Sequence, residues 1–301
     1  MTPSSSSWNI EGDYNADGAV CVRQAFNADE VAWAREAIDE NLANLSPLAK
    51  RASAETDGVF VEDFCNWNRL PIMERFIRES PGAAIAAELT GSNTIRLYHD
   101  HLLVKEPGTK QPTPWHQDQP YYNVTGFKNA SMWFPVDPVE RSSTLELIAD
   151  THRGPWYMPR TFLNDQAKWF PEGSLAELPN FSDDPETWRV LAWELEPGDA
   201  VFFNMLTVHG SGGVSGQNRR RVLSVRFLGD DMVHAPRRWR TSPPFDGLDA
   251  ELEPGVEMDH PLFPLLWTRE AGLLGNPWTA LPCRANHSAF CQPPFADRCF
   301  C

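Results

Sequence analysis

The feature that most restricts the fold of this 301-residue chain is a series of short β-type runs separated by breaker clusters. After Gly91, apolar and β-branched residues gather in runs at 94–104, 130–136, 144–148, 191–195, 200–203 and 222–228. Clusters of Pro, Gly and acidic residues lie between them, and the chain holds 26 prolines and 19 glycines. Proline and glycine end strands and favour turns. Many short strands joined by such turns predict an antiparallel sandwich or barrel.

The part of the chain before Gly91 carries helical patterns after one short strand predicted at 19–22. Asn27 is a suitable N-cap, and Glu30 stands where a capping box needs it. Apolar residues then recur at spacings of three and four, which places them on one helical face: Val31, Ala34, Ile38, Leu42 and Leu45. Two further helices are predicted, at 71–79 and 83–89. We therefore expect a mainly β fold with flanking helices on its N-terminal side.

The charge balance narrows the class of partner. The chain has 26 Lys and Arg against 41 Asp and Glu, a formal net charge of −15. Such a charge repels phosphate backbones and anionic lipid, so we expect neither nucleic acid nor a membrane as partner. No secretory signal is visible at the start of the sequence. The expectation is a cytoplasmic enzyme with a small-molecule substrate, and its oligomeric state is not predicted.

We expect one domain over residues 1–267, because a chain of this size can bury a sizeable core. Residues 161–190 lack strand periodicity and are predicted to form a lid or insertion with one helical piece. Residues 268–301 are predicted to be an irregular tail. Four cysteines crowd this tail, at spacings unlike those of structural zinc sites: Cys283, Cys291, Cys299 and Cys301.

Two short motifs carry side chains that can bind a metal ion. His116 and Asp118 are two residues apart, so on a strand both project to the same face. His209 follows the predicted strand at 200–203. Two His and one carboxylate on one face of an octahedral ion leave positions open, as in non-haem Fe(II) oxygenases. We therefore expect these three residues to bind Fe(II), with a hydrogen-bonded core histidine as the alternative for His116.

An arginine, Arg220, follows His209 by eleven positions. A 2-oxo acid bound to iron needs a cation for its second carboxylate, and a guanidinium can bind a carboxylate through two hydrogen bonds. Ser224 lies four residues beyond Arg220 on the same strand face, where its hydroxyl can donate to that carboxylate. The alternative for 219–221 is a solvated charged turn, which leaves the spacing from His209 unexplained.

Together these motifs resemble those of the phytanoyl-CoA dioxygenase family. The resemblance is carried by residues 113–118, 197–203 and 209–224, with further likeness at 103–108 and 144–154. In the last segment Ala-Asp-Thr-His replaces the family's Pro-Gly-Ser-His. The resemblance implies a double-stranded β-helix (jelly-roll, cupin-like) core. It also implies an Fe(II)- and 2-oxoglutarate-dependent dioxygenase that consumes O2 and takes ascorbate as a reductant in vitro.

The resemblance further implies which residues form the site. The catalytic iron ligands would be His116, Asp118 and His209. The residues around 2-oxoglutarate would be Arg220, Ser211, Ser224, Lys105 and Trp133. Tyr122 falls where a related hydroxylase places an aromatic side chain against its substrate, and its neighbour Tyr121 is a further candidate. Core packing is the alternative for both tyrosines and for Trp133.

The substrate is predicted only by class. Twelve tryptophans and the aromatic residues near the metal motif favour a medium-sized hydrophobic molecule, such as a secondary metabolite. The reaction expected is hydroxylation, or another oxidation, of an unactivated C–H bond that releases succinate and CO2. The carboxylate of Asp118 disfavours halogenation, because related halogenases lack it.

Two other functions remain open from the sequence. His99 and His101 partly imitate the metal motif of cupins, so a cupin-type dioxygenase or isomerase that uses no 2-oxoglutarate is one alternative. We expect these two histidines instead to line the substrate pocket. A non-catalytic jelly-roll binding protein is the other alternative.

Overall fold

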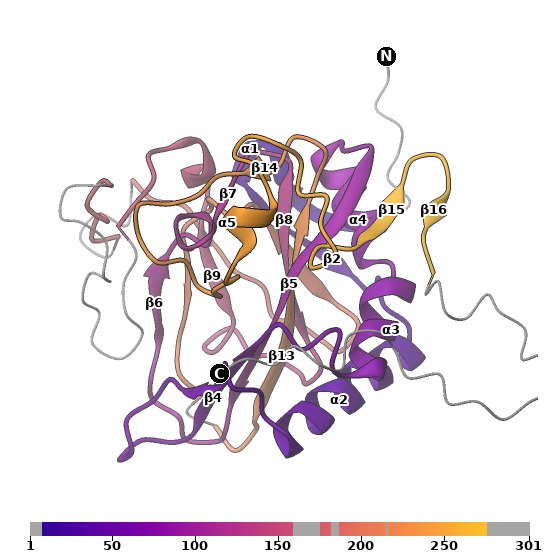
Figure 1. The fold of residues 1–301 in the computed structure, drawn as a ribbon. Helices are drawn as coiled ribbons and strands as arrows, with labels where there is room; N and C mark the ends of the chain where they lie inside the picture. Colours follow the sequence, from indigo (N-terminus) through magenta and orange to yellow (C-terminus); the bar gives the residue numbers. More distant parts are fainter. Residues whose placement is uncertain (1–7, 159–174, 182–186, 215, 276–301) are drawn as a thin grey trace, which may run out of the picture.

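A computed structural model describes residues 8–158, 175–181, 187–214 and 216–275, and within them ten strands form one large antiparallel sheet (Figure 1). Its main path runs through β1 (Asn9–Asp13), β2 (Ala19–Arg23), β11 (Ala200–Phe203), β8 (Asn129–Pro135), β13 (Arg220–Leu228), β5 (Thr94–Lys105), β15 (Leu265–Thr268) and β16 (Gly272–Leu273). The remaining two strands lie off this path, with β4 (Phe60–Phe64) paired to β5 and β3 (Lys50–Arg51) paired to β4. The long strands β5 and β13 therefore occupy the middle of the sheet.

A smaller antiparallel sheet packs against the inner face of the large one. Its order is β10 (Val190–Leu191), β9 (Leu145–Ile148), β12 (His209–Ser211) and β6 (Thr113–His116). A two-stranded ribbon joins β7 (Val124–Thr125) to β14 (Val233–His234), and two 3-10 turns cover Gln119–Tyr121 and Thr151–Arg153. Two facing antiparallel sheets are the jelly-roll arrangement predicted from the sequence.

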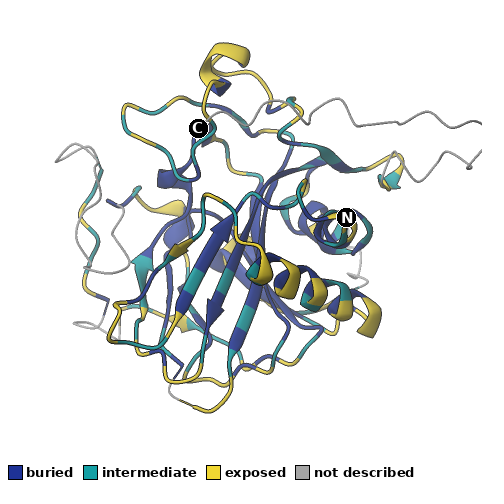
Figure 2. Cartoon of the chain, turned by 60° about the horizontal axis from the view of Figure 1, so that its bottom comes forward, coloured by how far each residue is buried: buried dark blue, intermediate teal, exposed yellow. Residues whose placement is uncertain are grey.

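Helices cover the outer face of the large sheet. They are α1 (Tyr14–Asp17), α2 (Ala28–Ala43), α3 (Pro71–Glu79) and α4 (Gly82–Thr90), with α5 (Leu248–Glu251) elsewhere. Figure 2 shows that α2 buries one side against the molecule and exposes the other. The predicted capping box is present, because the Asn27 side chain accepts from the Glu30 amide and Glu30 accepts from the Asn27 amide. Among the described residues, no helix has both the length and the apolar character needed to span a bilayer.

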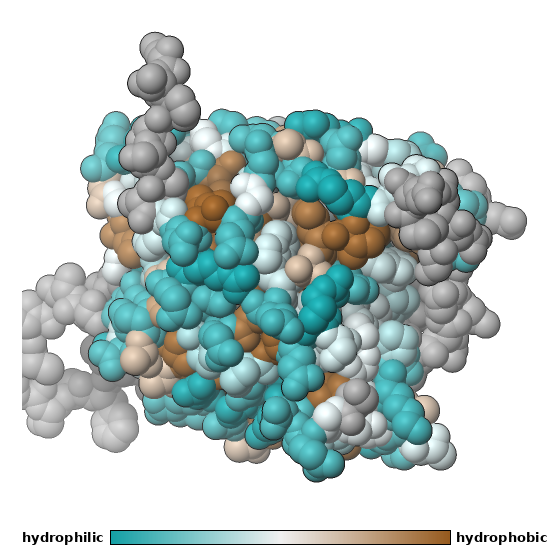
Figure 3. Space-filling model, turned by 180° about the vertical axis from the view of Figure 1, so that it is seen from behind, coloured by the Kyte–Doolittle hydropathy of each residue, from teal (hydrophilic) through white to brown (hydrophobic). Residues whose placement is uncertain are grey.

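The alternation of side chains along β11 explains how one sheet serves two cores. Ala200 and Phe202 join the cluster beneath the helices, whereas Val201 and Phe203 join the cluster between the two sheets. All four are buried, so the strand is apolar on both faces. The inner cluster borders the site described below. On the outside, Figure 3 shows hydrophobic side chains in several patches that hydrophilic ones separate.

Most predicted elements are observed, with differences at some boundaries. The run at 191–195 is a strand only at Val190–Leu191, because Leu195 pairs instead with Val139 in an isolated bridge. Strand β4 was not predicted, since its sequence places two acidic residues inside an apolar run. One of those two residues, Glu62, lines a cavity inside the protein.

The prediction of an irregular tail from residue 268 is wrong for its first residues. Thr268 pairs with Gly272, so that β15 and β16 form a hairpin at the edge of the large sheet. Gly272 has φ +72°, a backbone conformation that glycine adopts without strain and that turns the chain here. Residues 276–301, with the four tail cysteines, lie outside the described residues, as does most of the predicted insertion at 161–190.

Candidate active site

The three predicted metal ligands meet between the two sheets. His116 ends β6 and His209 begins β12, and the two residues are direct partners in the strand register. Asp118 Oδ1 lies 3.7 Å from His116 Nε2 and 3.8 Å from His209 Nε2. One donor atom from each residue lies within 4.8 Å of the others, and all three side chains are buried. This group can hold one metal ion, and two histidines with one carboxylate are the donors of non-haem iron oxygenases.

Backbone carbonyls orient both histidines. His116 Nδ1 lies 2.8 Å from the Pro114 carbonyl oxygen, and His209 Nδ1 lies 2.9 Å from that of Thr207. A carbonyl only accepts, so each Nδ1 carries the proton that it donates. The Nε2 lone pairs then face Asp118, which is the tautomer a metal ion requires. Burial lowers the pKa of His209, which keeps its imidazole neutral.

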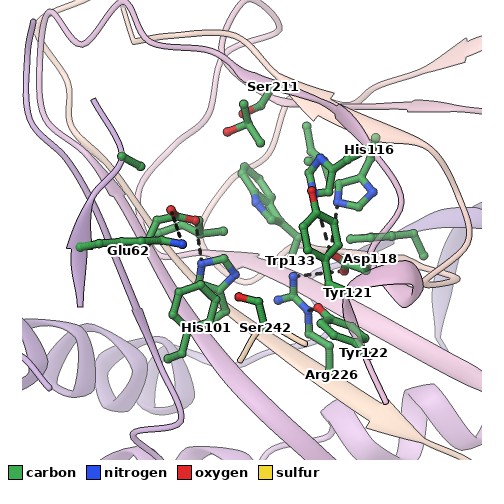
Figure 4. A pocket seen from close by; sticks show the side chains of 18 of the residues that line it. Glu62, His101, His116, Asp118, Tyr121, Tyr122, Trp133, Ser211, Arg226 and Ser242 are labelled. Carbon is green, nitrogen blue, oxygen red and sulfur yellow. Dashed lines mark hydrogen bonds and ion pairs between the residues drawn. The ribbon is translucent and has the colours of Figure 1, made fainter. Parts of the chain in front are cut away.

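Asp118 is held through its other oxygen. The Ser131 hydroxyl donates to Oδ2 at 2.9 Å, and Arg226 Nη2 lies 3.1 Å from the same oxygen. Burial opposes ionisation of Asp118, but the charge of Arg226 and the hydrogen bond from Ser131 outweigh it and hold the pKa of this carboxyl well below its usual range. The carboxylate is therefore charged, with Oδ1 turned toward the histidines (Figure 4).

Arg226 is a site residue that the sequence analysis missed. Besides Asp118, its guanidinium donates to the Ser224 hydroxyl at 2.6 Å and to the Tyr122 hydroxyl at 3.2 Å. The signal that could have identified it is the period of two along β13, since Arg226 shares a strand face with Ser224 and Arg220. The residues predicted on this face end at Ser224.

Arg220 lies on the same face, nearer the other end of the cavity. It is buried, and its guanidinium donates to the Ser143 carbonyl and, at 3.3 Å, to the Ser211 hydroxyl. The guanidinium carbon stands 5.4 Å from the centre of the Trp133 ring. Within the described residues its Nε has no hydrogen-bond partner and no carboxylate lies within ion-pair distance. Burial lowers the pKa of Arg220 to about 10, so it stays charged at neutral pH and suits an anionic ligand.

A cavity of about 420 Å³ contains the metal-binding group and most of the other predicted residues. His116, Asp118 and Tyr121 lie on one side of it, and Glu62 and His101 lie on the opposite side (Figure 4). The predicted residues that line it, besides the three ligands, are Arg220, Ser211, Trp133, Tyr121, Tyr122 and His101. Its wall thus joins aromatic surfaces to a few charged groups, as ligand sites do.

Three predicted residues do not line this cavity. Ser224 donates to the Met132 carbonyl and accepts from Arg226, so its hydroxyl supports the arginine. Lys105 Nζ donates to the carbonyls of Gln111 and Gly212 at 2.8 and 2.9 Å, which turns it toward the backbone. Burial lowers the pKa of Lys105 to about 6.

The third of these residues is His99. Its Nδ1 lies 3.1 Å from the Asp100 carbonyl oxygen, and its ring packs edge-on against Tyr122. The cupin alternative required His99 and His101 as ligands. Neither belongs to the metal-binding group found among the described residues, and His101 Nε2 lies 3.1 Å from Glu62.

Known structures share this fold. The structure of SnoK, a non-heme α-ketoglutarate dependent carbocyclase from nogalamycin biosynthesis, matches with a TM-score of 0.65 at 22% identity, over 84% of this chain and 93% of that one. The epimerase SnoN, in complex with Fe3+, α-ketoglutarate and nogalamycin RO, matches with a TM-score of 0.64 at 20% identity, over 84% and 95% of the two chains. At these identities the likeness establishes the jelly-roll fold.

Comparison of sequences establishes the family. A probable phytanoyl-CoA dioxygenase of Caenorhabditis elegans is 24% identical over 208 residues, which are 64% of this chain and 62% of that protein. The match therefore spans less than two thirds of the length of this relative. The family model of phytanoyl-CoA dioxygenase (PhyH) matches residues 14–222. The chain therefore belongs to the phytanoyl-CoA dioxygenase family.

Proposed function

We propose that this protein is a non-haem Fe(II)- and 2-oxoglutarate-dependent dioxygenase. Its reaction would hydroxylate, or otherwise oxidise, an unactivated C–H bond of a medium-sized small molecule and release succinate and CO2. The observation that carries the proposal is one cavity that contains both the His116–Asp118–His209 group and the guanidinium of Arg220, which pairs with no carboxylate in the described part of the chain. A metal-binding group alone fits many reactions, whereas the added buried cation favours a carboxylate-bearing cosubstrate.

The residues present fit ferrous iron. Both imidazoles present Nε2 lone pairs, and Asp118 presents Oδ1 while Ser131 and Arg226 occupy Oδ2. Three protein donors leave open positions on the ion, which is what an oxygenase needs. When bound, iron together with 2-oxoglutarate supplies the activation of O2 for C–H oxidation.

The chain itself supplies orientation and a water-poor surrounding. Arg220 would hold the distal carboxylate of 2-oxoglutarate, with Ser211 beside it and the Trp133 ring beneath the guanidinium. Phe203 packs against His209 with ring centroids 4.5 Å apart, and Tyr121 meets His116 edge-on at 5.9 Å. These rings shield the ligands from water and keep the imidazoles in one orientation.

We also propose the class of substrate. The cavity wall includes several aromatic residues, which suits a ring-containing secondary metabolite better than a free amino acid. Related folds support this view, since SnoN was solved with nogalamycin RO.

The decisive experiment measures succinate formed from 2-oxoglutarate, with added Fe(II), ascorbate and a panel of ring-containing metabolites. The expected result is succinate release that depends on Fe(II) and disappears in Asp118→Ala. Anaerobic Fe(II) titration of both proteins provides the second measurement. Absence of Fe(II) binding by the unsubstituted protein, or equal 2-oxoglutarate consumption by Asp118→Ala, would refute the proposal.

A further inference from the structure

One polar side chain of the cavity wall comes from the C-terminal part of the chain. Ser242 lines the cavity, and Figure 4 shows it between His101 and Arg226. It lies beyond residue 222, where the match to the family model ends. The metal-binding group and Arg220 lie before that point, so Ser242 can determine specificity separately from the residues proposed to bind iron and cosubstrate.

Ser242 is held through its backbone on the turn that follows Asp118. The Ser242 amide donates to the Tyr121 carbonyl at 2.9 Å. The guanidinium of Arg237, from the same segment, reaches the next carbonyl, with Nε 2.8 Å from the Tyr122 oxygen. The hydroxyl of Ser242 takes no part in these bonds, so its removal leaves the attachment of the segment in place.

The Ser242 hydroxyl is accessible to a ligand. The residue is half-buried, and among the residues that the structure describes none forms a hydrogen bond with this hydroxyl. A serine hydroxyl has one donor hydrogen and two acceptor lone pairs. A ligand that fills the cavity displaces water from this group, and affinity is lost unless the ligand replaces the hydrogen bond. A polar group on the ligand is therefore favoured here.

The charges of the cavity wall disfavour a cationic ligand. The side chains that line the cavity include more basic than acidic groups: Lys50, Arg51, Arg220 and Arg226 against Glu62 and Asp118. Both carboxylates face basic partners, with Glu62 Oε2 3.5 Å from Lys50 Nζ and Asp118 Oδ2 3.1 Å from Arg226 Nη2. A cation in the cavity would meet an excess of positive charge.

The two neighbours of Ser242 make an uncharged acceptor more suitable than an anion. The charge of Arg226 is balanced by Asp118, and burial lowers the pKa of His101 to about 4, so its imidazole is neutral. A carboxylate beside Ser242 would therefore find no free counter-charge there. The positive potential of the whole wall favours the negative end of a carbonyl dipole over the positive end of an N–H or O–H group.

We propose that Ser242 determines specificity by donating a hydrogen bond from Oγ to an uncharged carbonyl oxygen of the substrate. A ring ketone provides such an oxygen together with an apolar body for the aromatic wall. This inference rests on the proposed function, in that the carbonyl belongs to the molecule being oxidised. It adds one defined polar group to the ring-containing substrate proposed above.

The test compares three two-ring compounds of similar size: α-tetralone with a carbonyl, α-tetralol with a hydroxyl, and tetralin with neither. Their affinities for the full chain are measured by saturation-transfer NMR titration, without iron or 2-oxoglutarate. We expect the unsubstituted protein to bind α-tetralone more tightly than the other two. In Ser242→Ala the affinity for α-tetralone should fall by about 3- to 10-fold, the contribution of one neutral hydrogen bond, whereas that for tetralin should not change.

Two further variants complete the design. Ser242→Cys keeps a side chain of similar size but replaces the hydroxyl by a weak donor, so it should lose affinity for α-tetralone as Ser242→Ala does. It separates hydrogen bonding from shape, and it gives the same readout if Ser242→Ala does not fold. Thr241→Val is the matched control, because it removes the neighbouring hydroxyl, and Thr241 is not among the residues that line the cavity. Its three affinities should equal those of the unsubstituted protein.

Several results would overturn the inference. Equal affinity of the unsubstituted protein for α-tetralone and tetralin, including no binding of either, would do so. An unchanged affinity for α-tetralone in Ser242→Ala or Ser242→Cys, or an equal loss in Thr241→Val, would also contradict it. Tightest binding of α-tetralol would show that the position takes a donor and not a carbonyl. Because no iron or 2-oxoglutarate is present, these outcomes can be read even if the oxygenase proposal fails its own succinate test.

Discussion

Two buried arginines on one face of β13 differ in the negative charge that accompanies them. Arg226 contacts the carboxylate of Asp118 at 3.1 Å, whereas Arg220 has no carboxylate within ion-pair distance among the described residues. An uncompensated buried charge is costly, so a protein retains it where a ligand supplies the opposite charge. We therefore expect Arg226 to position Asp118 as a metal ligand, and Arg220 to bind the carboxylate of a ligand.

Replacement of Arg220 should separate cosubstrate binding from the rest of the reaction. In Arg220→Ala we expect the KM for 2-oxoglutarate to rise by about 10- to 100-fold, as expected for the loss of a charged hydrogen-bonding partner. Arg220→Lys should recover part of the loss, since it restores the charge without the planar fork. The measurement is succinate formation at varied 2-oxoglutarate.

The neighbouring residue provides the control for this prediction. Arg219 pairs with Glu106 and is not among the cavity residues, so Arg219→Ala should leave the KM for 2-oxoglutarate unchanged. A similar rise in both variants, or no rise in Arg220→Ala, would show that Arg220 does not hold the cosubstrate.

Replacement of Arg226 should weaken metal binding without removing a ligand. We expect Arg226→Gln to reduce Fe(II) affinity by about 10- to 100-fold, because a partner that orients a metal ligand typically contributes that much. Anaerobic Fe(II) titration checks this, and thermal denaturation reports separately on any loss of stability. The control is Arg221→Gln on the same strand, whose side chain instead pairs with Asp137 and Asp39. Equal Fe(II) affinity in Arg226→Gln and the unsubstituted protein would contradict the positioning role.

The pairing of strands β6 and β12 fixes the positions of the proposed metal ligands. His116 and His209 are register partners, and a shift of one residue in the β6–β12 pairing would turn one imidazole to the opposite face. The Met205 carbonyl accepts from the amides of both Asp118 and Gln119, which holds the chain where β6 ends. None of the described residues that line the cavity lies on α1 to α5, so we expect these helices to act on stability.

Because the strands carry the site and the helices do not, removal of a helix cap should affect stability alone. Asn27→Ala deletes the side chain that caps α2, and we expect a loss of about 1 kcal/mol in the free energy of unfolding. Urea denaturation measures the loss, and the KM for 2-oxoglutarate should stay the same. Glu36→Ala, at an exposed position within α2, is the control and should change the free energy by less than about 0.5 kcal/mol. A changed KM in Asn27→Ala would indicate that α2 influences the site.

The burial of ionisable groups between the sheets makes the stability of the protein depend on pH. Burial lowers the pKa of His101 to about 4, whereas an unfolded chain titrates near 6.5. As the pH falls through this window, the unfolded chain takes up a proton that the folded chain does not. The contribution of His101 is therefore complete above about pH 6.5 and is lost as the pH approaches 4.

We expect His101→Gln to lose less stability on acidification than the unsubstituted protein, by about 2 to 3 kcal/mol between pH 7.5 and 4.5. Urea denaturation at both pH values measures the difference. Other groups titrate in both proteins, so the comparison isolates His101. Parallel losses in the two proteins would mean that His101 is not kept neutral by the fold.

Much of this protein could be predicted from local pattern. The capping box at Asn27 and the strand at 200–203 depend on neighbours in sequence, and both are observed. The order of His116, Asp118, His209 and Arg220 also carried enough information to predict a shared site. Spacing within a strand determines the face of a side chain, and this rule holds without knowledge of the partner strand.

Other features depend on contacts between segments remote in sequence. Glu62 and Arg226 are ordinary charged residues in the sequence, and pairing of β4 with β5 and of β13 with β8 carries them to the cavity. Lys105 and Ser224 stand at plausible positions, yet carbonyls and a guanidinium from other segments take up their polar groups. Periodicity therefore determined the strands and the order of the ligands, whereas packing of distant strands determined which buried charges found partners, because the energy of a buried charge depends on whatever the fold places beside it.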